Sequence, residues 1–307
     1  MDTAQSKQHP SWNDPGAMSP SAHETTGEID ARGAVDAVQT WYHTIEIAPG
    51  VVTPGWFDLR PVIDRMPWPD VRGKRCLDVG TYDGHLAFEL ERRGASEVVA
   101  TDIRRHLDWD WPLRHRHTTA HELWRVAGES KGEGFEVAKR VLSSRVEREW
   151  ISIYDLDPER VGSFDVVVCG SLLLHLRDPV RALEAIRSVC RPDGKFMSSE
   201  QIDLGLTIAH PRTPVARFDG VTDLLHWWMA NAAGHRRMLE SAGFAIERSS
   251  GLYACPFGPA HPPPRRRELA RAARTALRRV VARGTGMPSV CLLAAPDPAV
   301  EAAAPTS

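Results

Sequence analysis

Short apolar runs alternate with segments of helical periodicity along most of the chain, a pattern that predicts a parallel sheet covered by helices. The runs Arg75–Val79 and Glu97–Thr101 are expected to be strands, the second ending at Asp102. The run Phe164–Cys169 is the most apolar, as is typical of a central parallel strand buried on both faces. The expected fold class is therefore α/β, with helices on both faces of the sheet.

Helix signals lie between these runs. Leu86 and Leu90 fall on one helical face, and Gly94 stands where that helix would end. Asp178 followed by Pro179 is the pattern of a capped helix start. Weaker signals predict a turn at Pro192-Asp193-Gly194, a helix ending at Gly243, and strands at 151–154, 195–199, 244–248 and 289–294.

The composition changes at both ends of the chain and in two internal segments. The N-terminal end is rich in small and polar residues, and the C-terminal end is rich in alanine and proline. Neither end shows a hydrophobic period, which predicts disorder. One internal segment is dense in Arg, His and Trp, and the other is a basic, Ala-rich helix pattern. The expected organisation is two tails (1–30 and 296–307), an N-terminal lid (31–70) and one main domain (71–295) with insertions at 104–150 and 261–284.

The 307 residues carry a formal net charge of -2, which gives no general attraction to nucleic acid or membranes. No stretch approaches the ~20 apolar residues of a membrane span, and no signal-peptide core is visible, so we expect a cytoplasmic protein. The five cysteines form no CxxC pair, and most lie in strand-like runs, which predicts free, buried thiols.

The loop after the first predicted strand carries the clearest chemical signal. Asp78, Gly80 and Gly84 form a D-x-G-x-x-x-G pattern at the strand end, where open α/β sheets bind ligands. A dinucleotide fingerprint would require glycine at position 82 to admit the pyrophosphate, and this chain has Tyr82 there. The loop therefore favours a nucleoside cofactor without phosphate, such as S-adenosylmethionine (SAM), over an ordinary structural turn.

Further acidic residues follow the next predicted strands. Asp102 can accept both ribose hydroxyls of an adenosine. Asp155 can accept the adenine amino group, with Tyr154 or Leu156 against the ring. Each signal is weak alone, because acids are common after strands, but together they strengthen the prediction of a SAM site.

Several segments together carry a family resemblance: Trp41-Tyr42-His43-Thr44-Ile45-Glu46, Thr53-Pro54-Gly55, Leu77-Asp78-Val79-Gly80-Thr81-Tyr82-Asp83-Gly84, Ser152-Ile153-Tyr154-Asp155-Leu156, Leu173-Leu174-His175-Leu176-Arg177-Asp178-Pro179, Trp227-Trp228 with Asn231, and Ala242-Gly243-Phe244. Over about residues 38–255 the chain resembles class I SAM-dependent methyltransferases. Within them it resembles the branch of wobble-uridine tRNA methyltransferase-like proteins.

The resemblance implies a Rossmann-like, seven-stranded methyltransferase sheet with helices on both faces, an N-terminal lid over the cofactor and an inserted segment. It implies that Asp78, Gly80 and Gly84 hold the methionine part of SAM. Two departures matter: the sequence around Asn231 differs from the family pattern, and no lysine lies in the matched motifs. The second departure favours SAM over carboxy-SAM, whose extra carboxylate needs a cation, although an arginine of the insertion could supply one.

Candidate catalytic residues are histidines, because an alcohol acceptor benefits from a general base near neutral pH. His175 is the first candidate, His226 the second and His43 the third. The remaining candidates are assigned to acceptor binding: Trp227, Trp228, Asn231, Glu200 and Asp203. Each of these could equally serve the core or a cap.

No metal is predicted, although His115, His117 and His121 fall at spacings that a two-histidine site could use. A lid over the acceptor is the preferred interpretation of that insertion. The basic segment is expected to be a solvated face, and it is also compatible with a homodimer contact or phosphate binding.

Three functions remain open. The first is methylation of a hydroxyl on a small molecule, such as a sugar-containing or aromatic metabolite. The alternatives are tRNA wobble-uridine modification and a non-catalytic SAM-binding module.

Overall fold

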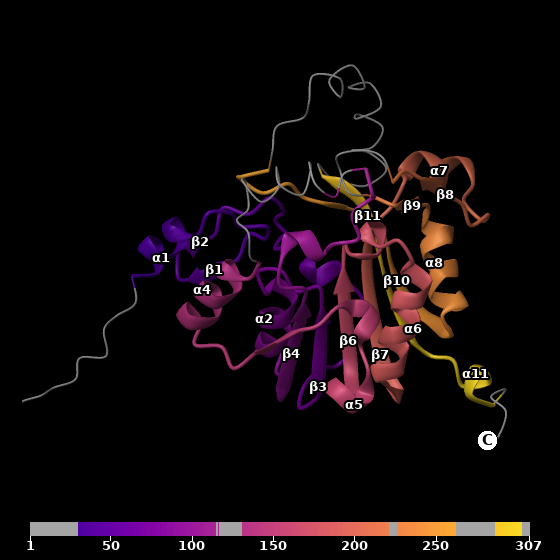
Figure 1. Cartoon of the computed structure of the whole chain (residues 1–307), viewed down its shortest axis with the longest axis horizontal. Coiled ribbons are helices and arrows are strands. Elements are labelled where there is room, and N and C mark those ends of the chain that lie inside the picture. The colour runs from indigo at the N-terminus through magenta and orange to yellow at the C-terminus, as the bar shows by residue number, and fades with distance from the viewer. Residues whose placement is uncertain (1–29, 115, 117–130, 221–225, 262–285, 303–307) are drawn as a thin grey trace, which may run out of the picture.

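The computed structural model describes residues 30–114, 116, 131–220, 226–261 and 286–302, and its centre is a seven-stranded mixed sheet (Figure 1). The strand order is β10-β11-β7-β6-β3-β4-β5. The five strands from β7 to β5 are parallel, and β11 is antiparallel to both of its neighbours. The strands are β3 (Arg75–Val79), β4 (Glu97–Asp102), β5 (Glu147–Trp150), β6 (Phe164–Gly170), β7 (Cys190–Gln201), β10 (Phe244–Cys255) and β11 (Met287–Pro296).

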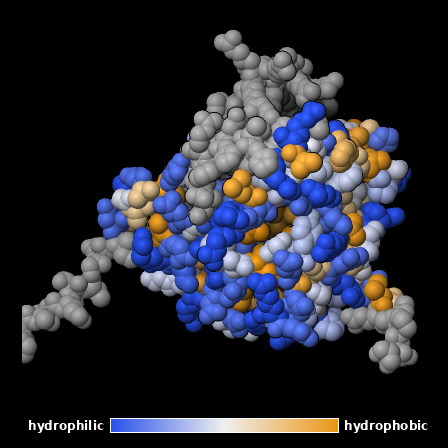
Figure 2. Space-filling view, in the orientation of Figure 1, coloured by the Kyte–Doolittle hydropathy of each residue, from blue (hydrophilic) through white to orange (hydrophobic). Residues whose placement is uncertain are grey.

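Helices cover both faces of the sheet, so the predicted fold class is confirmed. One hydrophobic core lies under α1 (Ala31–Ala37), α2 (His85–Arg92) and α4 (Glu133–Val141). The opposite core lies under α5 (Pro158–Val161), α6 (Pro179–Val189) and α8 (Ala232–Ser241). No described helix is long and apolar enough to cross a membrane. Figure 2 shows one face of the molecule, on which polar side chains predominate and apolar ones are scattered.

The N-terminal segment packs beside α4 (Figure 1). It also contacts the chain just after β10, the strand at the sheet edge opposite β5. It contains α1, β1 (Glu46–Ala48), β2 (Val51–Val52) and the 3-10 turn η1 (Ile63–Arg65). Phe57 forms isolated bridges with His43 and with Phe257, which follows β10. The buried Trp41 indole donates to the Val35 carbonyl at 3.1 Å, and both residues belong to the same hydrophobic core as α2 and α4.

Smaller elements surround the carboxyl ends of the strands, where the parallel strands and their loops meet. These elements are η2 (His106–Asp108), η3 (Ile153–Asp155), η4 (Leu173–His175), α7 (Leu204–Ala209), β8 (Ala216–Phe218) and β9 (Trp228–Ala230).

The predicted cap is confirmed, since the Asp178 side chain accepts from Arg181 N at 3.1 Å. All five cysteines are free and buried, as the sequence predicts.

The third strand of the parallel set differs from the prediction. The strand is Glu147–Trp150, and the predicted 151–154 run instead includes the start of η3, which Ser152 caps. Because β5 lies at the sheet edge, its residues are exposed or half-buried and give no apolar run. The apolar residues that suggested a strand, Ile151 and Ile153, pack into the core just beyond the strand end.

Three further differences concern segment boundaries. Residues 133–150 of the predicted 104–150 insertion belong to the domain itself, as α4 and β5. The predicted turn at 192–194 lies within β7 as an irregularity, because Cys190 pairs with Phe164 and Lys195 with Val166. Pro296 ends β11 and α11 (Pro298–Ala302) follows, where a disordered tail was expected. The segments 1–29, 262–285 and 303–307 lie outside the described residues.

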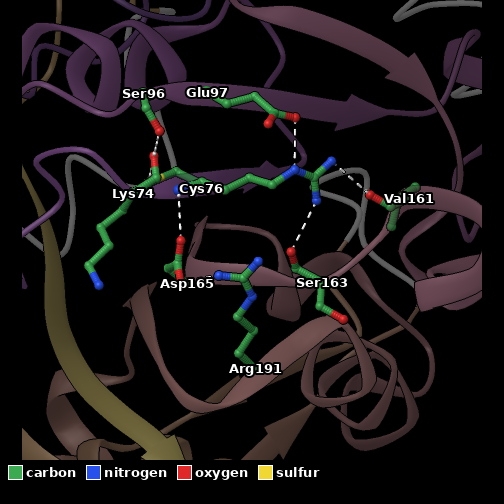
Figure 3. Close-up of polar contacts among 9 residues, drawn as sticks. Lys74, Cys76, Ser96, Glu97, Val161, Ser163, Asp165 and Arg191 are labelled. Atoms are coloured by element: carbon green, nitrogen blue, oxygen red, sulfur yellow. Dashed lines mark hydrogen bonds and ion pairs between the residues drawn. The ribbon is translucent and has the colours of Figure 1, made fainter.

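Arg75 connects three strands at their amino ends, opposite the edge that carries the predicted site. Its guanidinium donates to Glu97 Oε1 at 2.8 Å and to the carbonyls of Ser163 and Val161, both at 3.1 Å (Figure 3). It also lies 4.2 Å from the centre of the Phe164 ring, and its backbone N–H donates to Asp165. One side chain therefore holds the starts of β3, β4 and β6 in register.

Replacing Arg75 with alanine should lower the free energy of unfolding by about 2 kcal/mol, because two carbonyls lose a charged donor. Urea denaturation measures this change. The matched control is Arg72→Ala, since the Arg72 side chain is 79% exposed and pairs only with exposed Asp70 among the described contacts. The control should leave the midpoint unchanged. An Arg75 variant as stable as the control would show that the side-chain contacts of Arg75 do not stabilise the fold.

Candidate functional site

Two connected spaces lie at the carboxyl ends of β3, β4 and β6. The larger, which we call the main cleft, is bounded by the loop after β3, the end of β4, η3 and residues 170–176, with Tyr42 and Trp109 over it. Its volume, including the open mouth, is about 930 Å³. The second, which we call the inner cavity, shares Tyr42, His43 and residues 170–171 with the main cleft and extends toward β10 and β11.

The loop after β3 requires two left-handed glycines. Gly80 has φ +77°, and a Cβ there would come within 2.7 Å of a Leu172 methyl group, so both the backbone conformation and the packing of Leu172 favour glycine. Gly84 has φ +89° and begins α2, where a Cβ would meet Phe135 at 2.8 Å. Gly80 lines both spaces, whereas the role of Gly84 is the packing of α2.

Tyr82 lines the main cleft in a backbone conformation that tyrosine rarely adopts, with φ +49°. Its N–H donates to Asp102 Oδ2 at 2.9 Å, and its hydroxyl lies 3.1 Å from His106 Nε2. Ser171, with φ +50°, also lines the main cleft, so two of the three described non-glycine residues with positive φ are here. Backbone strain of this kind concentrates at functional sites.

Asp102 reaches the main cleft as predicted, but its carboxylate already has three donors. Oδ2 accepts from Tyr82 N, while Oδ1 accepts from Ile103 N at 2.8 Å and from Lys131 Nζ at 2.5 Å. Lys131 is buried, and its ammonium faces the rings of Tyr82 and Trp109. A ribose at Asp102 would share the carboxylate with Lys131. The expectation that no lysine serves the site came from the matched motifs alone, and Lys131 lies outside them.

An aromatic wall closes one side of the main cleft. Trp109 stacks between Trp111, at 5.8 Å, and His175, at 6.1 Å. Asp110 fixes this wall, because its carboxylate accepts from the Tyr154 hydroxyl at 2.6 Å and from Arg177 N at 2.9 Å. No local pattern predicts this role of Asp110, since its partners come from distant segments.

Asp78 lines the inner cavity and is 1% exposed. Its Oδ2 atom has no hydrogen-bond partner among the described residues. Burial raises the pKa of the Asp78 carboxyl to about 7, and nearby Asp102 adds to this effect. A buried carboxylate oxygen without a donor is costly, so Oδ2 suits a ligand that carries a cationic N–H group.

Asp83 fastens the N-terminal segment to the loop after β3. Its Oδ2 accepts from the backbone N–H groups of Tyr42 and His43, at 2.5 and 2.9 Å. Burial raises the pKa of Asp83 to about 7, although these two donors favour its ionised form. The same oxygen lies 4.0 Å from His43 Nδ1. The predicted lid is therefore attached directly to the site.

The structure brings part of the predicted site together. Tyr154 and His175 line the main cleft with Tyr82 and Asp102. By contrast, Asp155 is exposed and does not line the cleft, and Leu156 lies in the core. Because η3 replaces the predicted strand, Ser152 and Ile153 face the cleft beside Tyr154 instead.

The predicted acceptor-binding residues line neither of the two spaces. Asn231 caps α8, and its amide also donates to the carbonyls of His210 and Thr213, so its polar atoms are used within the protein. Asp203 caps α7. The indole N–H groups of Trp227 and Trp228 donate to the carbonyls of Asp110 and Arg177. These four side chains position loops around the site.

Glu200 and His226 also stand apart from the two spaces. Glu200 Oε1 accepts from Leu172 N and Leu173 N at 3.1 and 3.2 Å, which holds the start of η4. Burial raises the pKa of Glu200 to about 8. His226 packs 5.3 Å from the His175 ring, and burial lowers its pKa to about 3.

The histidines that suggested a metal, His115, His117 and His121, lie outside the described residues. Within the described ranges, no three His, Cys, Asp or Glu side chains come together as a set of metal ligands. The basic segment 261–284 lies almost wholly outside the described residues as well.

Curated relatives match part of this chain. The ubiquinone biosynthesis O-methyltransferase of Xanthomonas euvesicatoria pv. vesicatoria is 34% identical over 131 residues, which is 42% of this chain and 44% of that protein. The protein of the same name from Neisseria meningitidis serogroup C is 30% identical over 130 residues, 42% of this chain and 45% of that protein. The match thus spans less than half the length of these relatives.

A solved structure is similar at a greater distance. It is the Burkholderia thailandensis 1,6-didemethyltoxoflavin-N1-methyltransferase with bound 1,6-didemethyltoxoflavin and S-adenosylhomocysteine. The identity is 15% and the TM-score 0.44, over 74% of this chain and 72% of that chain. The resemblance to the wobble-uridine branch stays a prediction.

Residues 58–248, more than half of the chain, match the family model described as a methyltransferase domain. The predicted class, a SAM-dependent methyltransferase, is confirmed at the level of this family. The chain belongs to the methyltransferase-domain family.

Proposed function

We propose that this protein transfers a methyl group from SAM to a hydroxyl of a small-molecule acceptor. The observation that carries the proposal is the buried Asp78 carboxylate, which lines the inner cavity and has one oxygen without a hydrogen-bond partner among the described residues. SAM carries an ammonium group on its amino-acid part, and this group would supply the donor that Asp78 lacks. Carboxylates that are buried without a partner are rare outside functional sites.

The two spaces divide SAM between them. The adenosine belongs in the main cleft, where Asp102 and Lys131 can share the ribose hydroxyls and Tyr154 and Ile153 can contact the base. The amino-acid part belongs at the junction with the inner cavity, near Asp78 and Gly80. Tyr82 occupies the position that a pyrophosphate would need, which favours SAM over a dinucleotide.

A hydroxyl acceptor is favoured by the curated relatives, which are named as O-methyltransferases. A small acceptor is favoured by the lid, because Tyr42 and His43 line both spaces and are attached to Asp83. Methyl transfer is an in-line displacement on a sulfonium that is already electrophilic. The protein therefore contributes mainly by holding the acceptor close and aligned, which can supply several kcal/mol.

Replacing Asp78 with asparagine should weaken binding of S-adenosylhomocysteine at least ~10-fold, since the charged hydrogen bond to the ammonium is lost. The pH dependence follows from the raised pKa of about 7. Below pH 7 most Asp78 side chains hold a proton that binding must release, so wild-type affinity should fall as the pH drops from 8 to 6.

Isothermal titration calorimetry measures both effects. Asp203→Asn is the matched control, because asparagine can still cap α7 and the side chain lies outside both spaces. The control should bind like the wild type at each pH. Unchanged affinity in the Asp78 variant, or tight binding of NAD by the wild type, would contradict the proposed cofactor site.

Incubation with methyl-labelled SAM and a cell extract should transfer label to a small, extractable molecule. Mass spectrometry of the labelled fraction identifies the acceptor. Label in tRNA would support the wobble-uridine alternative instead. Tight binding of S-adenosylhomocysteine without any labelled product would favour the non-catalytic binding module.

A further inference from the structure

The adenine base of SAM has no assigned hydrogen-bond partner in the main cleft. The ribose is proposed to lie at Asp102, which pairs with Trp150 in the sheet. The chain continues from Trp150 into η3, so the base belongs beside η3. The sequence predicted that Asp155 accepts the adenine amino group, but Asp155 is exposed and lies outside the cleft. Another acceptor is needed if the site is to recognise this group.

Most of the side chains around the expected position of the base are aliphatic. An aromatic base can pack against such side chains, but they accept no hydrogen bond from its amino group. Binding sites of this kind take their specificity from a small number of polar groups among apolar walls. The aliphatic residues that line the main cleft are Val79, Ile103, Ile151, Ile153, Leu172 and Leu176.

Three carboxylates line the main cleft: Asp102, Asp108 and Asp110. Asp102 already has three donors and is assigned to the ribose. Both oxygens of Asp108 accept from the Arg105 guanidinium, at 2.7 and 3.1 Å. Asp110 differs, because no described residue donates a hydrogen bond to its Oδ1 atom. It is therefore the lining carboxylate with an oxygen to spare for the base.

The protein fixes the Asp110 side chain next to η3. Its Oδ2 atom accepts from the hydroxyl of Tyr154, in η3, at 2.6 Å and from the N–H of Arg177, just after η4, at 2.9 Å. The Trp227 indole also donates to the Asp110 carbonyl at 2.6 Å. Since both side-chain donors hold Oδ2, the carboxylate is oriented before a ligand arrives, and Oδ1 is left for the ligand.

We propose that Asp110 determines which base the cofactor site accepts: its Oδ1 atom takes a hydrogen bond from the amino group of adenine. The inference rests on the SAM site of the proposed function. It assigns the role predicted for Asp155 to a residue that follows β4 instead of β5. A purine with an oxygen in place of the amino group would bring two acceptors together, so the site selects a 6-amino over a 6-oxo purine.

Two probes isolate this contact. S-adenosylhomocysteine and S-inosylhomocysteine share the amino-acid part and the ribose, and they differ at the position of the amino group, where inosine has an oxygen. The contributions of Asp78 and Asp102 are therefore common to both. Isothermal titration calorimetry on the full chain, at one pH, should show at least ~10-fold tighter binding of S-adenosylhomocysteine by the wild type.

Asp110→Asn should shift this preference. The Tyr154 and Arg177 donors require an acceptor at the Oδ2 position, so the amide oxygen takes that position and the amide nitrogen takes the other. The nitrogen then offers a donor to the 6-oxo group and none of its atoms accepts from the amino group. The ratio of the affinities for the adenosyl and inosyl compounds should fall at least ~10-fold. The thermal unfolding midpoint should stay near that of the wild type, because both contacts are kept.

Asp155→Asn is the matched control. It makes the same chemical change at the residue that the sequence suggested, on an exposed side chain outside the main cleft. Its affinity ratio should equal that of the wild type. An altered ratio in this variant would return the role to Asp155 and overturn the inference.

Two further results would also reject the role of Asp110. Equal affinity of the wild type for the two compounds would show that the site does not read the amino group, and this test needs no variant. An unchanged ratio in the folded Asp110 variant would show that another group reads it. In these cases S-adenosylhomocysteine still binds and the proposed function stands, whereas no binding of it by the wild type would overturn the proposed function itself.

Discussion

The site depends on one buried carboxylate that joins two parts of the chain. Asp83 belongs to the loop after β3, yet it accepts hydrogen bonds from two consecutive N–H groups of the N-terminal segment. Without those donors, an ionised group that is 1% exposed would be strongly destabilising. Without Asp83, Tyr42 and His43 would have unpaired N–H groups at the edge of the main cleft and the inner cavity. The loop and the lid thus stabilise each other, and the walls of both spaces depend on their contact.

Buried polar contacts likewise hold the opposite side of the main cleft in place. Tyr82 adopts a left-handed backbone conformation that would cost of order 1–3 kcal/mol, and surrounding contacts offset this cost. Its N–H is fixed by Asp102, which in turn is neutralised by Lys131. Asp110 ties the aromatic wall to Tyr154 and the chain before α6. Polar groups therefore position the apolar surfaces, because apolar contacts alone would not fix such geometry.

Local sequence signals predicted those parts of the fold whose structure depends on residues close together in the chain. The apolar run of β6, the glycines after β3 and the Asp178 cap could all be predicted, because each depends on residues a few positions apart. The edge strand β5 could not, since its exposed residues carry no apolar pattern. The same distinction between local and distant partners holds for the candidate site. Asp78, Gly80, Tyr82 and Asp102 follow strands, and their common location follows from the sheet. Lys131 and Asp110 act through partners distant in sequence, which no local pattern reveals.

Asn231 shows why acceptor-binding residues are harder to predict from sequence than residues of the loop after β3. An asparagine next to tryptophans suggests a binding site. Its amide, however, caps α8 and forms hydrogen bonds that hold residues 210–215. A polar side chain can serve a ligand only if the protein leaves some of its hydrogen-bonding atoms unpaired. By that criterion Asp78 and His43 are available and Asn231 is not. The proposed cofactor residues are marked in sequence by the backbone geometry around them, whereas residues that could bind an acceptor are marked only by the hydrogen-bonding atoms that the folded chain leaves unpaired.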